Sequence, residues 1–328
     1  MMKGWLNRIG NTPLVPLDKL FKNDRDIAVY GKMELMNPGG SAKDRPALRM
    51  IKSAWESGSL RPGSVVIESS SGNMAISLAA ICSYLGMKFI SVIDPRTTAQ
   101  NTAIMKAFGA EVSYVDTPDP ETGEFLPARL EQVRRLLNEI PGSFWPNQYG
   151  NPHNPHAHAE GTMREIAEAL DRVDYVVGGV STCGTMLGCQ TFIKERGLRT
   201  KVVAVDAAGS VIFGGEKGPR RFPGLGAGIV PPFGERRFMD IAMNVTDWEM
   251  ATGCRELAAA ESILAGPSSG ACIAALRSLM TDIPDGSVCV VILHDRGERY
   301  MDTVFNDDWL RKQFGSLPLE GGRGRCSI

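Results

Sequence analysis

Short runs rich in β-branched residues alternate along this chain with longer amphipathic stretches, and this alternation restricts the fold more than any other feature. The runs predict strands and the stretches predict helices, because their apolar residues recur with the corresponding periods. Strand–helix alternation is typical of parallel sheets covered by helices. The predicted strands are 27–34, 64–68, 88–93, 111–115, 175–180, 201–206 and 288–294, and the predicted helices are 47–57, 74–85, 100–108, 128–140, 161–170 and 184–196.

We therefore predict an α/β fold of two lobes, each a mostly parallel twisted sheet flanked by helices, with a crevice between them. Residues 144–158 (FWPNQYGNPHNPHAH) are rich in loop-forming residues and are the best candidate for a junction. We expect a smaller domain over 40–147, a larger one over 1–39 and 148–315, and a flexible tail over 316–328. Several predicted strands end in Ser or Gly clusters, where α/β proteins bind ligands.

The composition and the charge argue against several other classes of protein. A chain of 328 residues with 43% apolar residues can bury a sizeable core, and its net charge of -1 gives no reason to expect nucleic acid or an anionic membrane surface as a partner. Seven cysteines without a CxxC pair and four histidines without ligand spacing argue against a metal site and a disulfide framework. No stretch is long enough to cross a bilayer, and the N-terminus has no apolar region after its charge, so we expect a cytoplasmic protein.

A lysine stands where one of the helices is predicted to begin. In the segment NPGGSAKDRPA (37–47), Asn-Pro and Gly-Gly break any strand, and a helix begins near Lys43. The positive end of the helix dipole repels an ammonium group and lowers its pKa, which suits an amine that must attack an aldehyde. This segment alone leaves open the alternative of a solvated surface lysine beside Asp44 and Arg45.

Two further segments leave a predicted strand and enter a predicted helix, which is a favourable place for an anion. In ESSSGNMA (68–75), Ser70, Ser71 and the backbone amides suit a substrate carboxylate, and Asn73 can donate to a phenolate oxygen. In GGVSTCGTMLG (178–188), small residues let backbone amides approach a phosphate, and Thr182 and Thr185 add hydroxyl groups. Neither GxxxxGK[ST] nor GxGxxG is present. A serine helix cap and a tight turn are the respective alternatives.

A fourth segment, LAGPSSGA (264–271), places Ser268 at another predicted helix start. A serine hydroxyl beside a pyridine nitrogen leaves that ring largely neutral, whereas an aspartate would keep it protonated. A neutral ring favours β-elimination over transamination. A helix-capping serine is the alternative.

Together and in this order, the segments resemble the fold-type II pyridoxal-phosphate enzymes of the cysteine synthase and cystathionine β-synthase group. The resemblance covers roughly residues 5–309 and includes IGNTPLV (9–15), FPGLGAG (222–228) and DRGERY (295–300). It implies a fold like that of the tryptophan synthase β subunit. It also implies pyridoxal 5'-phosphate as the cofactor, held by the larger domain, while the smaller domain carries the substrate loop. Family members are typically homodimers.

The resemblance carries the family's site residues onto positions of this chain. Lys43 falls on the catalytic Schiff-base lysine, Asn73 on the partner of the ring hydroxyl, and Ser268 on the partner of the pyridine nitrogen. No metal is implied. The cofactor-binding residues are predicted to be Lys43, Asn73, Ser181, Thr182, Cys183, Gly184, Thr185 and Ser268, and the substrate-binding residues Ser70, Ser71, Gly72, Asn73, Arg129, Gln148, Tyr149 and Gly224.

Departures from the family pattern point away from sulfide as the nucleophile. Met74-Ala75 replaces the last two residues of TSGNTG, Ser181 and Cys183 replace two glycines of GTGGT, and the segment Asn147-Gln148-Tyr149 replaces QQF. These changes add polar groups, which sulfide does not need. VDAAGSVIFG (205–214) and the ending DRGERYMD resemble the siderophore-pathway branch, which serves 2,3-diaminopropionate synthesis. In that branch the amine of L-glutamate attacks the three-carbon unit of O-phospho-L-serine.

Two anionic amino-acid substrates require cationic or hydrogen-bonding groups in the crevice. Arg129, which is predicted to lie in the first turn of its helix, is the main candidate, and Tyr149 and Ser181 are the others. A solvated helix face is the alternative for Arg129. Arg220 and Arg221 precede FPGLGAG and are interpreted as part of a charged loop.

The resemblance implies a β-replacement in which Lys43 anchors the cofactor, removes the Cα proton and returns it. The alternatives are a cysteine synthase that uses O-phosphoserine or O-acetylserine with sulfide, and a serine/threonine dehydratase. A further alternative is a catalytically inactive binding subunit, because the cysteine synthase fold also docks a serine acetyltransferase tail. The presence of Lys43, Asn73 and Ser268 favours an enzyme.

Overall fold

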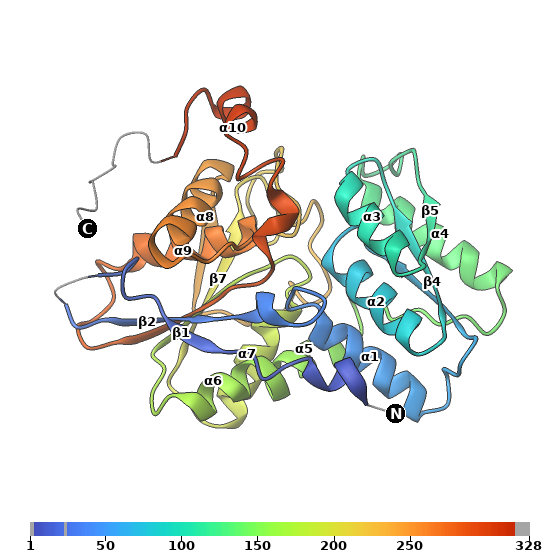
Figure 1. Ribbon diagram of the computed structural model, residues 1–328, viewed down its shortest axis with the longest axis horizontal. Helices are drawn as coiled ribbons and strands as arrows, with labels where there is room; N and C mark the ends of the chain where they lie inside the picture. Colours follow the sequence, from blue (N-terminus) through green and yellow to red (C-terminus); the bar gives the residue numbers. More distant parts are fainter. Residues whose placement is uncertain (1–2, 23–24, 319–328) are drawn as a thin grey trace.

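The strands of this chain form two separate sheets (Figure 1). The computed structural model describes residues 3–22 and 25–318. Within them, six strands form a larger sheet in the order β1-β2-β9-β6-β7-β8, and three form a smaller sheet in the order β3-β4-β5. Every pairing is parallel except that of β1 with β2. The strands are β1 Leu14–Pro16, β2 Ala28–Lys32, β3 Val65–Ser69, β4 Lys88–Ile93, β5 Glu111–Tyr114, β6 Tyr175–Gly179, β7 Lys201–Ala207, β8 Ile241–Val245 and β9 Val288–Ile292.

Helices flank both sheets, which confirms the predicted α/β class. The α-helices are α1 Asp44–Glu56, α2 Asn73–Tyr84, α3 Ala99–Ala107, α4 Phe125–Glu139, α5 His153–Ala157, α6 Arg164–Ala169, α7 Gly184–Glu195, α8 Asp247–Glu261, α9 Pro267–Leu279 and α10 Asp307–Phe314. The shorter helical turns are η1 Gly4–Arg8, η2 Glu34–Met36 and η4 Gly297–Tyr300, and η3 His158–Met163 is a π-helical turn.

The larger sheet is buried on both faces. Val177 and Val291 pack into the core beneath α8 and α9, while Val176 and Val290 pack into the core with α7. Successive side chains of a strand point to opposite faces, so a strand that is buried on both faces reads as an unbroken apolar run. This burial explains why the central strands were recognisable in the sequence.

The smaller sheet is covered in the same way, and it lies with α2, α3 and α4 at the right of Figure 1. Val66 and Phe89 pack into one core with α1, α2 and α3, whereas Ile67 and Ile90 pack against α4. Its three strands fall inside the range 40–147, and the strands of the larger sheet fall outside it. The domain boundaries themselves stay a prediction.

Two of the strands that the sequence did not predict are the edge strands of the larger sheet. Strands β1 and β8 lie at the two ends of the larger sheet, are only partly buried, and lack the continuous β-branched pattern of a central strand. Helix α8 was also missed, although Thr246 and Glu249 form a capping box at its start. The predicted helix 161–170 begins instead as the π-helical turn η3 and continues as α6.

Other expectations from the sequence concern a membrane span, a metal site, disulfides and the tail. In the part of the chain that the structure describes, no helix is both long and apolar enough to cross a membrane. In the same part, no group of His, Cys, Asp and Glu residues is arranged to hold a metal ion, and the six described cysteines form no disulfide. Of the tail predicted over 316–328, residues from 319 onward lie outside the described residues.

Helices α8 and α9 approach each other very closely at two glycines. A Cβ atom on Gly253 would overlap the carbonyl oxygen of Gly270, and a Cβ atom on Gly270 would overlap the carbonyl oxygen of Met250. The two backbones are therefore in contact, and this contact fixes how α9 sits on the sheet. Helix α9 begins at Pro267, so the same contact helps to position Ser268.

We expect Gly253→Ala to lower the free energy of unfolding by about 1–3 kcal/mol, because the added methyl group forces α8 and α9 apart. The better helix propensity of alanine offsets only a part of this loss. Urea unfolding measures the change, with Ala259→Ser on the exposed side of α8 as a control that should shift stability by less than about 0.5 kcal/mol. An unchanged stability in Gly253→Ala would show that the two helices can separate freely.

Candidate active site

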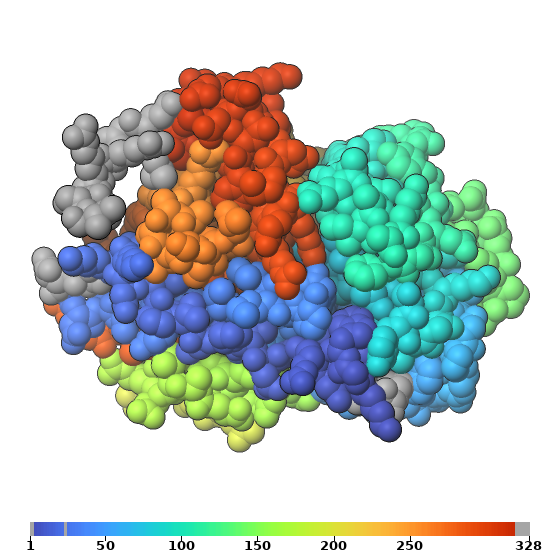
Figure 2. Space-filling view, in the orientation of Figure 1, coloured from blue at the N-terminus to red at the C-terminus, as the bar shows by residue number. Residues whose placement is uncertain are grey.

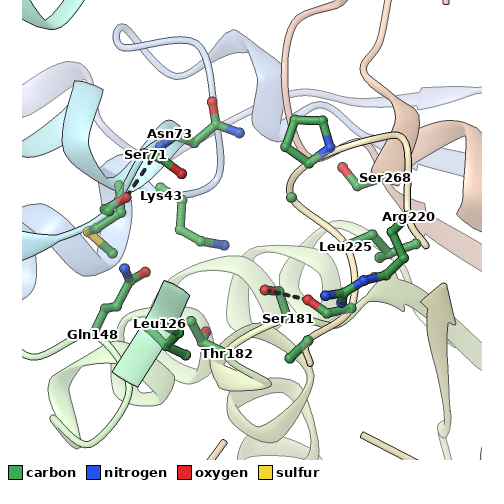
Figure 3. A pocket seen from close by; sticks show the side chains of 18 of the residues that line it. Lys43, Ser71, Asn73, Leu126, Gln148, Ser181, Thr182, Arg220, Leu225 and Ser268 are labelled. Carbon is green, nitrogen blue, oxygen red and sulfur yellow. Dashed lines mark hydrogen bonds between the residues drawn. The ribbon is translucent and has the colours of Figure 1, made fainter. Parts of the chain in front are cut away.

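A pocket of about 360 Å³ lies where the carboxyl ends of strands from both sheets meet (Figure 3). Its walls come from segments that follow β3, β4, β6, β7 and β9, together with the start of α1. This is the edge at which parallel α/β sheets bind ligands. The structure brings all the predicted site residues together in this pocket, namely Lys43, Ser70, Ser71, Gly72, Asn73, Arg129, Gln148, Tyr149, Ser181, Thr182, Cys183, Gly184, Thr185, Gly224 and Ser268.

A short backbone pairing delivers the lysine to this pocket. The N–H of Ala42 donates to the carbonyl of His294 at 2.8 Å, and the N–H of Arg296 donates to the carbonyl of Gly40 at 3.1 Å. Between them, Ser41 forms an antiparallel bridge with Asp295. The segment that precedes α1 is thereby fixed to the end of β9.

Lys43 is the residue immediately before α1, and Figure 3 shows its side chain extending into the pocket. Burial lowers the pKa of the Lys43 ammonium below its ordinary value, and the nearby carboxylate of Asp295 opposes this change. The sequence pattern predicts that the helix dipole lowers the pKa of Lys43. In the structure, burial is the main cause of the lowered pKa. A lysine with a lowered pKa has more of the neutral amine that can act as a nucleophile or a base.

One buried carboxylate connects the side chains at two sides of the pocket. Asp295 accepts hydrogen bonds from Asn73 Nδ2 at 2.8 Å, from Tyr300 Oη at 2.6 Å and from Ser268 Oγ at 3.5 Å. Arg299 donates to the Oδ1 atom of Asn73. The DRGERY segment therefore orients both Asn73 and Ser268. Sequence reasoning gave Asp295 no role, although an acidic residue directly after the predicted strand 288–294 was a signal for one.

The loop between β6 and α7 has the features of a phosphate site. Cys183 has a φ of 66°, in the left-handed region that favours glycine, and a Cβ atom on Gly184 would overlap Asn154. The first amides of α7 have no partner within the helix, and the hydroxyl groups of Thr182 and Thr185 stand beside them. This cradle of small residues and donors fits the phosphate of pyridoxal 5'-phosphate.

Two histidines support this loop, and the sequence gave no indication of either role. The side chain of His158 contacts Thr185 Oγ1 at 3.3 Å, and the amide of Gly179 donates to His294 Nε2 at 2.9 Å. Burial lowers the pKa of His294 to about 3, so this ring stays neutral and can accept that hydrogen bond. The end of β6 is thereby connected to the end of β9.

The loop after β3 combines a helix cap with an open anion site. Ser70 Oγ accepts from the amide of Ala75 at 3.2 Å, so this hydroxyl serves the start of α2, as the helix-cap alternative expected. Ser71 and Asn73 lie together at the pocket edge in Figure 3. Of the two serines, Ser71 is therefore the one whose hydroxyl is better placed for a substrate carboxylate.

Behind this loop, the buried Glu68 holds the segment that contains Gln148 and Tyr149. Its carboxylate accepts from Trp145 Nε1 and from the amide of Gln148, both at 3.1 Å, and from the amide of Ser69 at 2.8 Å. Gln148 Nε2 also donates to the carbonyl of Ser69 at 3.0 Å. Burial raises the pKa of Glu68 to about 7, although these hydrogen bonds lower it.

Arg129 is not on a solvated helix face. Its side chain is buried, with the residue 9% exposed, and its Nε atom lies 3.4 Å from Asp94 Oδ2. It also lies near Tyr149: burial raises the pKa of the Tyr149 phenol, while the charge of Arg129 lowers it. Because α4 begins at Phe125, Arg129 stands in the second turn rather than the predicted first turn. Arg129 and Tyr149, two of the three residues proposed to recognise substrate, are therefore neighbours.

Arg220 and Arg221 lie in a loop, as expected, but Arg220 also lines the pocket. Figure 3 shows the Arg220 side chain at the pocket, beside Leu225 and Ser181. Arg221 lies differently, since its side chain bonds Asp247 and Gln313 on the elements α8 and α10. Adjacent arginines with the same expected role thus have different surroundings.

Comparisons with known proteins agree with this geometry. The family model described as "Pyridoxal-phosphate dependent enzyme" matches residues 6–295. A curated N-(2-amino-2-carboxyethyl)-L-glutamate synthase from Ralstonia nicotianae (strain ATCC BAA-1114 / GMI1000) is 44% identical over 311 residues, which cover 94% of this chain and 91% of the relative.

Solved structures with the same fold include two enzymes with other names. The structure of O-ureido-L-serine synthase matches with a TM-score of 0.85 and 31% identity, covering 94% of this chain and 99% of that one. The O-acetylserine dependent cystathionine beta-synthase from Helicobacter pylori matches with a TM-score of 0.84 and 30% identity, covering 92% of this chain and 98% of that one.

The raised pKa of Glu68 predicts a pH-dependent loss of stability. In the unfolded chain the carboxyl ionises near its ordinary value of 4.5, whereas in the folded chain it stays protonated up to about 7. The contribution of Glu68 to stability is therefore complete below pH 4.5 and is lost as the pH rises to about 7. Relative to Glu68→Gln, the wild type should lose up to about 3 kcal/mol over this window, at about 1.4 kcal/mol per pKa unit.

Urea unfolding of both proteins at several pH values between 4 and 8 measures this difference. The exposed Glu56→Gln is the matched control for the replacement of a glutamate by a glutamine. Parallel stability curves for the wild type and Glu68→Gln would contradict the raised pKa.

Proposed function

Because the chain belongs to the pyridoxal-phosphate dependent enzyme family, we propose that it joins the three-carbon unit of O-phospho-L-serine to the amine of L-glutamate, releasing phosphate. The product would be N-(2-amino-2-carboxyethyl)-L-glutamate, in agreement with the name of the 44% identical relative. The chain is an enzyme of the β-substituting type, and the alternative of an inactive binding subunit is not supported. The proposal includes a role in siderophore synthesis, through 2,3-diaminopropionate, and a cytoplasmic homodimer.

The pocket residues divide into three groups in this proposal. The amides and hydroxyl groups of residues 181–185 would hold the cofactor phosphate, Asn73 the ring hydroxyl and Ser268 the pyridine nitrogen. When bound, pyridoxal 5'-phosphate supplies an aldehyde that condenses with an amine and a ring that withdraws electrons from Cα. Asp295 would keep Asn73 and Ser268 at fixed positions through its hydrogen bonds to both.

Lys43 would transfer the proton. Because burial lowers the pKa of Lys43, the free amine is available to remove the Cα proton of the donor and to return it later. The Cβ–O bond then breaks with phosphate as the leaving group, and a bond forms between Cβ and the nitrogen of the second amino acid. That nitrogen loses a proton as it bonds.

The substrate carboxylates and the phosphate group require donors, and the pocket walls supply them. The loop Ser70–Asn73 at the start of α2 would bind the donor's α-carboxylate. Arg129, Tyr149 and Ser181 would recognise the remaining anionic groups. The observation that carries the proposal is this polar wall, in which the buried Arg129 lies beside Tyr149, since sulfide would need no such recognition.

The product formed from competing nucleophiles tests the proposal. The purified enzyme is supplied with pyridoxal 5'-phosphate, O-phospho-L-serine, and L-glutamate and sulfide at equal concentrations, and products are identified by mass spectrometry. We expect N-(2-amino-2-carboxyethyl)-L-glutamate and stoichiometric phosphate. If cysteine predominates, the enzyme is a cysteine synthase, and if pyruvate forms without a nucleophile, it is a dehydratase.

We expect Lys43→Ala to lower kcat by at least about 100- to 10,000-fold, because it removes the group that transfers the Cα proton. The variant should also lose the visible absorbance of the lysine-bound cofactor. The control is Lys52→Ala on the exposed face of α1, which should keep both properties. Normal absorbance in Lys43→Ala would show that another amine holds the cofactor.

A further inference from the structure

A second arginine reaches the pocket from the wall opposite α4. Figure 3 shows Arg220 and Leu225 on one side of the pocket, and Leu126 of α4 and Gln148 on the other. The Arg220 side chain is half-buried, and its Nη1 atom lies 2.8 Å from the position that a Cβ atom on Gly226 would occupy. The carbonyl of the same Gly226 accepts a hydrogen bond from Ser181 Oγ at 3.2 Å. Arg220 therefore lies close to the phosphate loop.

The guanidinium of Arg220 lacks a carboxylate partner among the described residues. Its Nη1 atom is buried and has no hydrogen-bond acceptor. The two acids that influence its pKa most form no ion pair with it. Glu124 pairs with Lys217 at 2.7 Å and with Arg96 at 3.4 Å, and Asp206 Oδ1 accepts a hydrogen bond from the amide of Ala207 at 2.8 Å.

Within the described part of the chain, each of the other arginines that line the pocket has a carboxylate partner, which Arg220 lacks, although the buried Nε atom of Arg129 also has no hydrogen-bond acceptor. Arg96 pairs with Glu124, Arg129 with Asp94, and Arg221 with Asp247, each at 3.4 Å. A partly buried cation without a partner is unfavourable, and an anionic ligand would remove that cost. The planar guanidinium group is also well suited to bind a carboxylate through two parallel hydrogen bonds.

We propose that Arg220 is a specificity-determining residue that binds the side-chain carboxylate of the amine-bearing substrate. This inference rests on the proposed function, in which that substrate is L-glutamate. Of the other anionic groups, the donor's α-carboxylate is assigned to Ser70–Asn73, the donor's phosphate to Arg129, Tyr149 and Ser181, and the cofactor phosphate to the amides and hydroxyl groups of residues 181–185. Arg220 would thus hold the amine-bearing substrate from the wall opposite α4, so that its nitrogen faces the Cβ atom of the donor.

The test compares Arg220→Gln with Arg221→Gln, a control in the same loop whose side chain bonds α8 and α10 instead. The KM values for O-phospho-L-serine, L-glutamate and L-glutamine are measured for each protein, together with the Kd for pyridoxal 5'-phosphate. We expect Arg220→Gln to raise the KM for L-glutamate about 10- to 100-fold, as for the loss of one charge-assisted hydrogen bond. Its preference for L-glutamate over L-glutamine should largely disappear.

Unlike the KM for L-glutamate, the constants for the donor and for the cofactor should not change in Arg220→Gln. The KM for O-phospho-L-serine, the release of phosphate from it and the Kd for pyridoxal 5'-phosphate should stay within about twofold, which also shows that the variant is folded. Arg220→Lys should recover part of the preference for L-glutamate, because it restores the charge.

Other outcomes would overturn the proposal. A rise in the KM for O-phospho-L-serine would assign Arg220 to the donor's phosphate, and a weaker Kd for pyridoxal 5'-phosphate would assign it to the cofactor. Equal losses with L-glutamate and L-glutamine would show that the side-chain carboxylate is not its ligand. If the wild type forms no product from L-glutamate, the proposed function fails as well, whereas normal use of L-glutamate by Arg220→Gln refutes only the role of Arg220.

Discussion

The antiparallel backbone pairing between residues 40–42 and 294–296 is the contact on which the pocket depends. It fixes the segment before Lys43 to the end of β9 in the larger sheet, although α1 belongs to the core of the smaller sheet. Directly behind it, Arg45 forms buried ion pairs with Glu34 at 2.7 Å and with Glu165 at 2.6 Å. Separating the members of a buried ion pair leaves uncompensated charges and is unfavourable. These ion pairs therefore help to fix the position of α1 relative to the larger sheet.

Burial sets the chemical character of the pocket more than any single charge does. It is the main influence on the pKa of Lys43, of His294 and of Glu68, and in each case it favours the uncharged form. The cationic side chains of Arg96 and Arg220 belong instead to the pocket walls. An amine with a lowered pKa at the centre and cations around it suit a reaction between anionic amino acids.

The sequence was sufficient to predict the central architecture and the location of the pocket. Buried parallel strands such as β6 and β9 have an unbroken apolar pattern, and the loops after β3 and β6 carry recognisable small and hydroxyl-bearing residues. The edge strands β1 and β8 could not be recognised, because a half-exposed strand lacks that pattern. The position of Asp295 after a predicted strand was a signal for a role, but its hydrogen-bond partners and the role of Arg220 could not be predicted, since each depends on which side chains from distant segments surround it.

The burial of the Cys183 side chain has a consequence for the reaction of this thiol with oxidants. A thiol in a phosphate-binding loop would ordinarily be exposed to attack, because nearby amides and cations stabilise the reactive thiolate. Here the side chain is buried, and its pKa is raised to about 12. The group therefore stays a protonated thiol that neither peroxide nor alkylating reagents readily modify.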